Sequence, residues 1–277
     1  MSAQDVAVAV WRRCLDNVGV ALATLTRKPS IDPQRPWLLP ARELAIASGI
    51  VIAVFLISMF FIDAPTTRAV QRLPHWIVSF FDSITDYGKS GYVLWPLGLA
   101  FLALAALPRL SPGLEQRVLA AVMVRIGFLF AAVAVPGMFD TIIKRLIGRA
   151  RPLVGGSLDP TLFHPFAWQA AYASLPSGHA TTSFALIVAV ASLWPRARTY
   201  VLIYAVMIAI SRVVVTAHYP SDVAMGALVG IAGALMVRRW FAMRRLGFSF
   251  GPDGAVHAYP GPSLRRVKTV ARAALAD

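Results

Sequence analysis

The chain has 277 residues, of which 57% are hydrophobic and 14% are charged, whereas a soluble domain is about 25% charged, so an ordinary soluble globular protein is excluded. The net charge of +14 could indicate a nucleic acid partner, but the basic residues flank apolar segments and form no continuous patch, which argues against one. The single cysteine, Cys14, excludes an internal disulfide and a cysteine-based metal site.

Residues 1–42 are predicted to form a basic cytoplasmic segment without a cleavable signal peptide. Apolar residues recur with roughly helical spacing over residues 3–25, which fits either an amphipathic helix on the membrane surface or a loosely ordered basic tail. Residues 28–40 contain four prolines and are interpreted as a linker. The first long apolar run, Leu44–Ile62, begins too far into the chain for an ordinary signal sequence, so we expect it to be an uncleaved anchor.

Apolar runs of roughly the 20 residues that a membrane-crossing helix needs predict six spans. Residues 73–87 are apolar but too short to cross, and their aromatic side chains suit a helix lying in the membrane interface. The predicted fold class is an all-α polytopic membrane protein, a six-transmembrane helical bundle over residues 43–243 with an interfacial helix between the first two spans. Residues 244–277 are predicted to be a cytoplasmic basic tail near anionic headgroups. The six spans are about 43–62, 92–107, 118–140, 179–195, 199–217 and 222–243.

The distribution of lysine and arginine predicts the orientation of the chain in the membrane. With the N-terminus in the cytoplasm, 18 of the 27 basic residues belong to the cytoplasmic side, counting Arg238 and Arg239 at the inner end of the sixth span, and 8 belong to the opposite side, counting Arg212 at the outer end of the fifth. Both termini are therefore predicted to be cytoplasmic. The ends of the third and fifth spans, and the starts of the fourth and sixth, then meet at the outer face. The predicted localisation is a bacterial-type inner membrane, with the candidate site on its periplasmic face.

Three basic residues converge on this outer face. Lys144 and Arg151 follow the third span, and Arg212 ends the fifth. The arginine fork matches two phosphate oxygens, and lysine acts as a point charge. Ser177 and Gly178 directly precede a predicted helix, whose free N–H groups and dipole favour an anion. These five residues are predicted to bind a tetrahedral oxyanion.

Two histidines and one carboxylate complete the predicted site. Asp222, four residues after His218, can accept one ring N–H and so fix the tautomer in which the other nitrogen is a nucleophile. His179 can protonate the leaving oxygen as a general acid. Transfer to His218 would give a phosphohistidine that water then hydrolyses. Three cations would take the place of the metal that many phosphotransfer enzymes use.

The three segments match, without a departure, the three-part signature of the type 2 phosphatidic acid phosphatase family, which the chain also resembles in its six spans. The resemblance implies a membrane lipid phosphatase with His218 as the nucleophile, His179 as the general acid and Asp222 as the orienting carboxylate. It also implies the five phosphate-binding residues named above, and no metal or other cofactor. The matching segments are Lys144-x6-Arg151-Pro152, Pro176-Ser177-Gly178-His179 and Ser211-Arg212-x5-His218-x3-Asp222.

The substrate and two rival functions stay open at this point. Undecaprenyl pyrophosphate, phosphatidylglycerophosphate, phosphatidate and a phosphate of lipid A all fit a cationic pocket at a membrane surface. A lipid phosphotransferase would use the same pocket. A phospholipid or anion transporter would need the cations but not His179 or the pair of His218 and Asp222. Vanadate-dependent haloperoxidases resemble the same family in the same motifs, but they are soluble, and the six spans argue against that chemistry.

Other ionisable residues are expected to have structural roles. Arg125, Arg145 and Arg149 are interpreted as anchors at the membrane interface. Asp140 lies one turn before Lys144 and is expected to form a structural ion pair with it. Surface or loop positions are expected for the three histidines outside the motifs, which are His75, His164 and His257.

Overall fold

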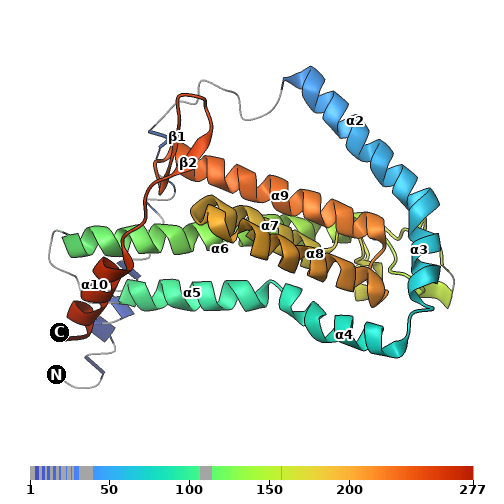
Figure 1. The fold of residues 1–277 in the computed structure, drawn as a ribbon, viewed down its shortest axis with the longest axis horizontal. Helices are drawn as coiled ribbons and strands as arrows, with labels where there is room; N and C mark the ends of the chain where they lie inside the picture. Colours follow the sequence, from blue (N-terminus) through green and yellow to red (C-terminus); the bar gives the residue numbers. More distant parts are fainter. Residues whose placement is uncertain are drawn as a thin grey trace. The chain divides into compact units, whose positions relative to one another are not determined.

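The computed structural model describes residues 40–106, 114–156 and 158–276, together with scattered short stretches before residue 31. The predicted amphipathic segment over 3–25 and the linker over 28–40 lie largely outside the described residues. Helices dominate the described part, and strands occur there in one short hairpin (Figure 1). The predicted all-α class is confirmed.

Within the described residues, five helical segments are long and apolar enough to cross a membrane. Five of the six predicted spans fall in these segments. The fourth predicted span corresponds to helix α7, Gly178–Leu193, which is apolar but has 16 residues and a length of about 24 Å at 1.5 Å per residue. The five longer segments are Ala41–Val70, His75–Ala106, Gln116–Ile147, Pro195–Val214 and Pro220–Met243.

The first of these segments is interrupted near its end. Helix α2, Ala41–Ile57, buries none of its residues, as expected for an apolar helix that faces lipid. A π-helical turn over Ser58–Ile62 follows, and helix α3, Asp63–Val70, continues from it. Such turns are rare and often lie at functional sites. The turn directly precedes Asp63, which is fully buried.

The predicted interfacial helix over 73–87 is present as helix α4, His75–Thr85, followed by a 3-10 turn over Asp86–Gly88. Helix α5, Gly91–Ala106, corresponds to the second predicted span. The position of α4 relative to a membrane stays a prediction.

Three further long helices carry the motifs. Helix α6, Leu114–Ile147, extends beyond the predicted third span, so Lys144 lies in its last turn. Helix α8, Arg198–Val214, ends just after Arg212. Helix α9, Pro220–Met243, begins at the proline between His218 and Asp222, in agreement with the preference of proline for the first turn of a helix.

Contacts between residues divide the chain into two compact units. The first unit comprises Met1–Pro33, Leu94–Ala131 and Val237–Asp277. In it, strand β1, Phe248–Phe250, pairs antiparallel with strand β2, Val256–Ala258. Helix α10, Leu264–Ala276, follows the hairpin, so the predicted basic tail contains regular structure. The ring of Phe128 packs edge-on against those of Phe241 and Phe248, with centroid distances of 5.4 and 4.6 Å.

The second unit comprises Gln34–Val93 and Ala132–Met236 and contains every predicted site residue. Helices α7 and α8 lie side by side in it, and α4 and α3 both contact α8 (Figure 1).

Two glycines set the distance between α9 and α7. A Cβ atom added to Gly226 would lie 2.4 Å from the carbonyl oxygen of Ser177, and one added to Gly230 would lie 2.3 Å from that of Thr181. Only glycine permits so close an approach of two helix backbones. The approach is fixed further by the Ser177 N–H, which donates to the carbonyl oxygen of Asp222 at 3.0 Å. The second and third motifs are thereby joined at their backbones.

Candidate active site

The part of the first motif that follows the end of α6 is an extended segment. The N–H of Ala150 donates to the carbonyl oxygen of Leu162 at 2.9 Å, and the N–H of Arg151 donates to that of Ala171 at 2.8 Å. Side chains two residues apart in an extended segment point to the same side. Arg149 and Arg151 accordingly both act on Asp222, Arg149 through an ion pair and Arg151 through its charge.

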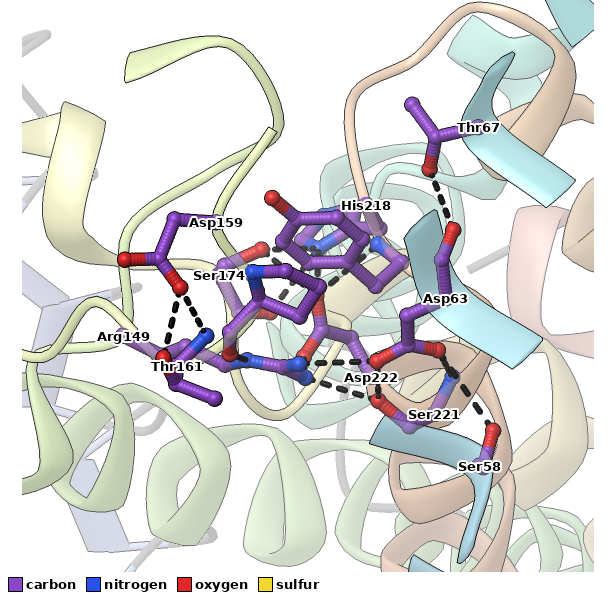
Figure 2. Close-up of polar contacts among 12 residues, drawn as sticks. Ser58, Asp63, Thr67, Arg149, Asp159, Thr161, Ser174, His218, Ser221 and Asp222 are labelled. Carbon is purple, nitrogen blue, oxygen red and sulfur yellow. Dashed lines mark hydrogen bonds and ion pairs between the residues drawn. The ribbon is translucent and has the colours of Figure 1, made fainter. Parts of the chain in front are cut away.

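His218 lies in the short connection between α8 and α9, and its side chain is buried. Its Nδ1 atom lies 2.8 Å from the carbonyl oxygen of Ser174 (Figure 2). A carbonyl oxygen can only accept a hydrogen bond, so Nδ1 carries the proton and Nε2 keeps its lone pair. The ring is thus held in the tautomer that a nucleophile at Nε2 requires.

Burial also keeps this ring uncharged. Desolvation lowers the pKa of His218 from its ordinary 6.5 to about 4, and Asp222 opposes the shift while Arg212 and Arg151 add to it. At neutral pH the imidazole is therefore neutral, as a nucleophile must be.

Asp222 does not hydrogen-bond the ring of His218 directly. Its Oδ2 atom lies 3.9 Å from Nδ1 of His218, beyond hydrogen-bond distance. It accepts hydrogen bonds instead from Oγ of Ser174 at 2.6 Å (Figure 2) and from the N–H of Tyr219 at 2.9 Å. The sequence predicted a direct bond from His218 to Asp222. In the structure Asp222 holds Ser174, and the carbonyl oxygen of Ser174 holds the ring.

Four buried polar atoms of the predicted site have no hydrogen-bond partner among the described residues. They come from all three motifs, and leaving such an atom unpaired costs about 1–3 kcal/mol. A group of them in one region indicates a site that a polar ligand fills. The atoms are Nε of Arg151, Oγ of Ser177, Nε2 of His179 and Nε of Arg212.

The cations of the site are held by specific neighbours. Lys144 pairs with Asp140 at 2.7 Å, so the predicted ion pair is present. A Cβ atom added to Gly178 would lie 3.2 Å from Nζ of Lys144, which shows how closely this lysine approaches the start of α7. Nη1 of Arg212 donates to Oγ1 of Thr85 at 2.6 Å, so α4 also positions the site.

Comparison with known proteins identifies relatives of the chain. The family model described as the PAP2 superfamily matches residues 125–246. A lipid A 1-phosphatase of Rhizobium johnstonii is 32% identical over 206 residues, which are 74% of this chain and 84% of that protein. A lipid A 1-phosphatase of Rhizobium etli is 34% identical over 206 residues, or 74% of this chain and 88% of that protein. The chain belongs to the PAP2 superfamily.

Two solved structures are also similar in fold. The crystal structure of Aquifex aeolicus LpxE has a TM-score of 0.47 and 20% identity, and covers 65% of this chain and 96% of that one. The crystal structure of the first transmembrane PAP2 type phosphatidylglycerolphosphate phosphatase, from Bacillus subtilis, has a TM-score of 0.48 and 18% identity, and covers 69% of this chain and 93% of that one.

The predicted family is confirmed, and with it the predicted class of enzyme. The chain is a membrane lipid phosphatase of the PAP2 superfamily, a phosphomonoester hydrolase. The roles of single residues in this PAP2 site stay predictions, supported by the geometry above.

The interpretation of Arg149 as an interface anchor is wrong. Its side chain is fully buried and pairs with two carboxylates, Asp222 at 2.5 Å and Asp63 at 2.7 Å. Arg125, also interpreted as an anchor, bonds the carbonyl oxygen of Tyr259 at 2.9 Å in the C-terminal segment. Arg145 is partnered as well, since it donates to the carbonyl oxygen of Trp168.

Two residues of the site were not found by sequence reasoning. Ser174 lies three residues before Ser177 in a loop, and nothing in its local pattern marks it. Asp63 did carry a signal, because it is a carboxylate at the end of the apolar run Leu44–Ile62. A charged group there is costly and usually functional. Arg212, at the end of the fifth predicted span, is a charged residue of the same kind.

Proposed function

We propose that this PAP2 phosphatase hydrolyses a headgroup phosphate of a lipid through a phosphohistidine on His218, without a metal ion. The observation that carries the proposal is the buried neutral ring, with Nδ1 bonded at 2.8 Å and Nε2 left as the nucleophile. The 1-phosphate of lipid A is the proposed substrate, because both lipid A 1-phosphatases are related to the chain over most of their length.

The proposed reaction has two steps. In the first, Nε2 of His218 bonds to phosphorus while the bond from phosphorus to the lipid oxygen breaks, and His179, protonated once the anionic phosphate lies beside it, gives that oxygen a proton. In the second, water attacks phosphorus, His179 takes the proton from water, and His218 leaves as a neutral imidazole. Lys144, Arg151 and Arg212 compensate the charge that the equatorial oxygens carry in both steps.

We also propose on which face of the membrane the site lies. The excess of lysine and arginine on one side supports cytoplasmic termini and a site at the outer face of the inner membrane. A lipid headgroup at that face would reach the pocket directly from the bilayer, so no aqueous transfer of the substrate is needed.

A panel of lipids tests substrate and mechanism together. Purified protein in detergent containing EDTA is given lipid A, phosphatidate, phosphatidylglycerophosphate and undecaprenyl pyrophosphate, and phosphate release is measured. We expect the fastest release from lipid A, and a loss of at least roughly 1,000-fold in His218→Ala. Absence of turnover with every lipid, or unchanged turnover in His218→Ala, would contradict the proposal. Restoration of activity only by added metal would contradict its metal-independent part.

Oxygen-18 water separates hydrolysis from transfer. Hydrolysis places one labelled oxygen in the released phosphate, whereas a phosphotransferase leaves the phosphate on a second lipid. Acid-labile, base-stable label on the protein, absent from His218→Ala, is the expected sign of the phosphohistidine.

A further inference from the structure

The carboxylates of Asp63 and Asp222 both pair with the guanidinium of Arg149, close to His218. Arg149 donates from Nη1 to Asp222 at 2.5 Å and from Nη2 to Asp63 at 2.7 Å, and all three side chains are fully buried. Its Nε donates to the carbonyl oxygen of Pro160 at 3.0 Å, and its guanidinium lies 4.7 Å from the ring centroid of Tyr219. We call Asp63, Arg149 and Asp222 the buried triad.

Asp63 lies far from the three motifs in the sequence. It follows the π-helical turn of the first membrane segment, and both of its oxygens bind the start of α9. Oδ1 accepts from the N–H of Ser221 at 3.0 Å, and Oδ2 accepts from the hydroxyl of Ser221 at 2.5 Å (Figure 2). A carboxylate at a helix N-terminus is stabilised by the free N–H groups and the helix dipole. Asp63 therefore ties α3 to the turn of α9 that carries Asp222.

The charges of the buried triad sum to minus one. Asp222 alone would provide that charge beside His218, but the ion pair with Arg149 cancels it. Asp63 restores it. Buried charges interact strongly because little solvent screens them.

The charge matters when His218 reacts. Once Nε2 bonds to phosphorus while Nδ1 keeps its proton, the ring becomes cationic. The other groups that act on His218 are cations or a histidine: Arg212 on α8, Arg151 after α6, and His179 at the start of α7. None of these favours a positive ring, so among the side chains that act on His218 only the buried triad favours one.

We propose that Asp63 and Arg149 are positioning residues of the phosphatase, Arg149 by holding Asp222 and Asp63 by keeping the buried triad negative beside the cationic ring. The proposal rests on the phosphohistidine mechanism proposed above. It gives the first membrane segment, which contributes none of the three motifs, a part in the reaction.

Two variants that change the charge of the buried triad in opposite directions test this role. In Asp63→Asn the triad becomes neutral, so a proton on His218 is less favoured. The acidic limb of the pH profile of kcat/KM is therefore expected to move about one pH unit lower. We also expect kcat to fall roughly tenfold, with KM unchanged. In Arg149→Gln the triad carries minus two, so the limb is expected to move to higher pH. The double variant restores minus one and is expected to return the limb to its wild-type position.

Two controls separate charge from structural damage. Asp159→Asn makes the same substitution at an exposed aspartate whose side chain bonds Thr161, and it is expected to leave kcat and the limb unchanged. Asp63→Glu keeps the charge and is expected to keep the wild-type limb. A variant whose fold is damaged would contain less active protein, but the acidic limb of its pH profile would stay in place.

The outcomes distinguish this proposal from the mechanism on which it rests. Wild-type turnover without a trapped phosphohistidine would overturn the mechanism. A trapped phosphohistidine that forms at the wild-type rate in Asp63→Asn, or a limb that shifts in the same direction in both single variants, would overturn the role of the triad alone. If Arg149→Gln fails to fold, the profiles of Asp63→Asn and Asp63→Glu decide the matter.

Discussion

At the scale of single residues, the proposed chemistry depends on the two nitrogens of one imidazole, that of His218, having different partners. Nδ1 of His218 faces the carbonyl oxygen of Ser174, and this bond leaves Nε2 free to react. The backbone of Ser174 thus holds the ring, and its side chain bonds Asp222. One loop residue links the nucleophile to the carboxylate.

Substitution of Ser174 separates these two contacts. Ser174→Ala removes the 2.6 Å hydrogen bond to Asp222 and the 3.5 Å contact of Oγ with Nδ1 of His218, but it keeps the carbonyl oxygen that binds the ring at 2.8 Å. A hydrogen bond to a charged group contributes about 1.5–3 kcal/mol, so we expect kcat for lipid phosphate to fall by roughly one order of magnitude. The much larger loss expected for His218→Ala provides the upper limit. Ser79→Ala is the matched control, at an exposed serine whose hydroxyl lies 3.2 Å from Nδ1 of His75.

The buried His218 also predicts how stability depends on pH. Its folded-state pKa is about 4, whereas the unfolded value is about 6.5. Between these values the unfolded chain binds the proton and the folded chain does not, so the free energy of unfolding falls as the pH is lowered from 6.5 to 4. The contribution of this one group is about 3 kcal/mol and is fully present above pH 6.5. Thermal unfolding in detergent is expected to show a smaller loss in His218→Gln than in the wild type over this range, and equal losses would contradict the assignment.

At the scale of elements, the site depends on helices that begin or end at the right residue. Helix α9 begins between His218 and Asp222, α7 begins beside His179, and α8 ends after Arg212. The glycines of α9 bring two of these ends together. Long-range order in the site therefore comes from backbone contact as well as from side chains.

Enlarging a glycine of α9 tests this contact. Gly226→Leu would push α9 away from the carbonyl oxygen of Ser177, which lies 2.4 Å from an added Cβ. We expect a destabilisation of about 1–3 kcal/mol or more, together with loss of activity, because the N–H of Ser177 would leave the carbonyl oxygen of Asp222. Gly49→Leu is the control, since Gly49 lies in the apolar helix α2 with nothing within 4 Å of an added Cβ. Thermal unfolding and phosphate release of the two variants are compared, and equal effects would exclude a special role for the α9 contact.

At the scale of the whole molecule, the predicted orientation follows from charge, and its consequences are testable without activity. Cys14 is the only cysteine of the chain, so it reports on the N-terminal segment directly. On spheroplasts, a membrane-impermeant maleimide is expected to leave Cys14 unlabelled until the membrane is opened. The double variant Cys14→Ser and Thr161→Cys, which moves the thiol to the exposed loop after the first motif, is expected to react at once. The reverse pattern would place the site on the cytoplasmic face.

The amino-acid sequence alone determined the membrane class and the family, and it predicted eight site residues. Composition and the length of apolar runs reflect the local requirement that a chain in lipid be apolar and helical. The motif residues could be found because each motif is short and its spacing is preserved within one segment. The extent of α7, the hairpin near the C-terminus and the true end of α6 were not predicted, since helix ends depend on tertiary contacts as much as on local propensity.

Only the tertiary structure decided which residues support the motifs. Asp63 and Arg149 are 86 residues apart, and Ser174 and Asp222 are 48 apart, so no periodicity could pair them. An arginine beside a membrane span has the same local sequence pattern whether it faces headgroups or a buried carboxylate. Arg149 belongs to the second kind because the fold places two aspartates within reach, and a buried charge is stable only where such partners exist.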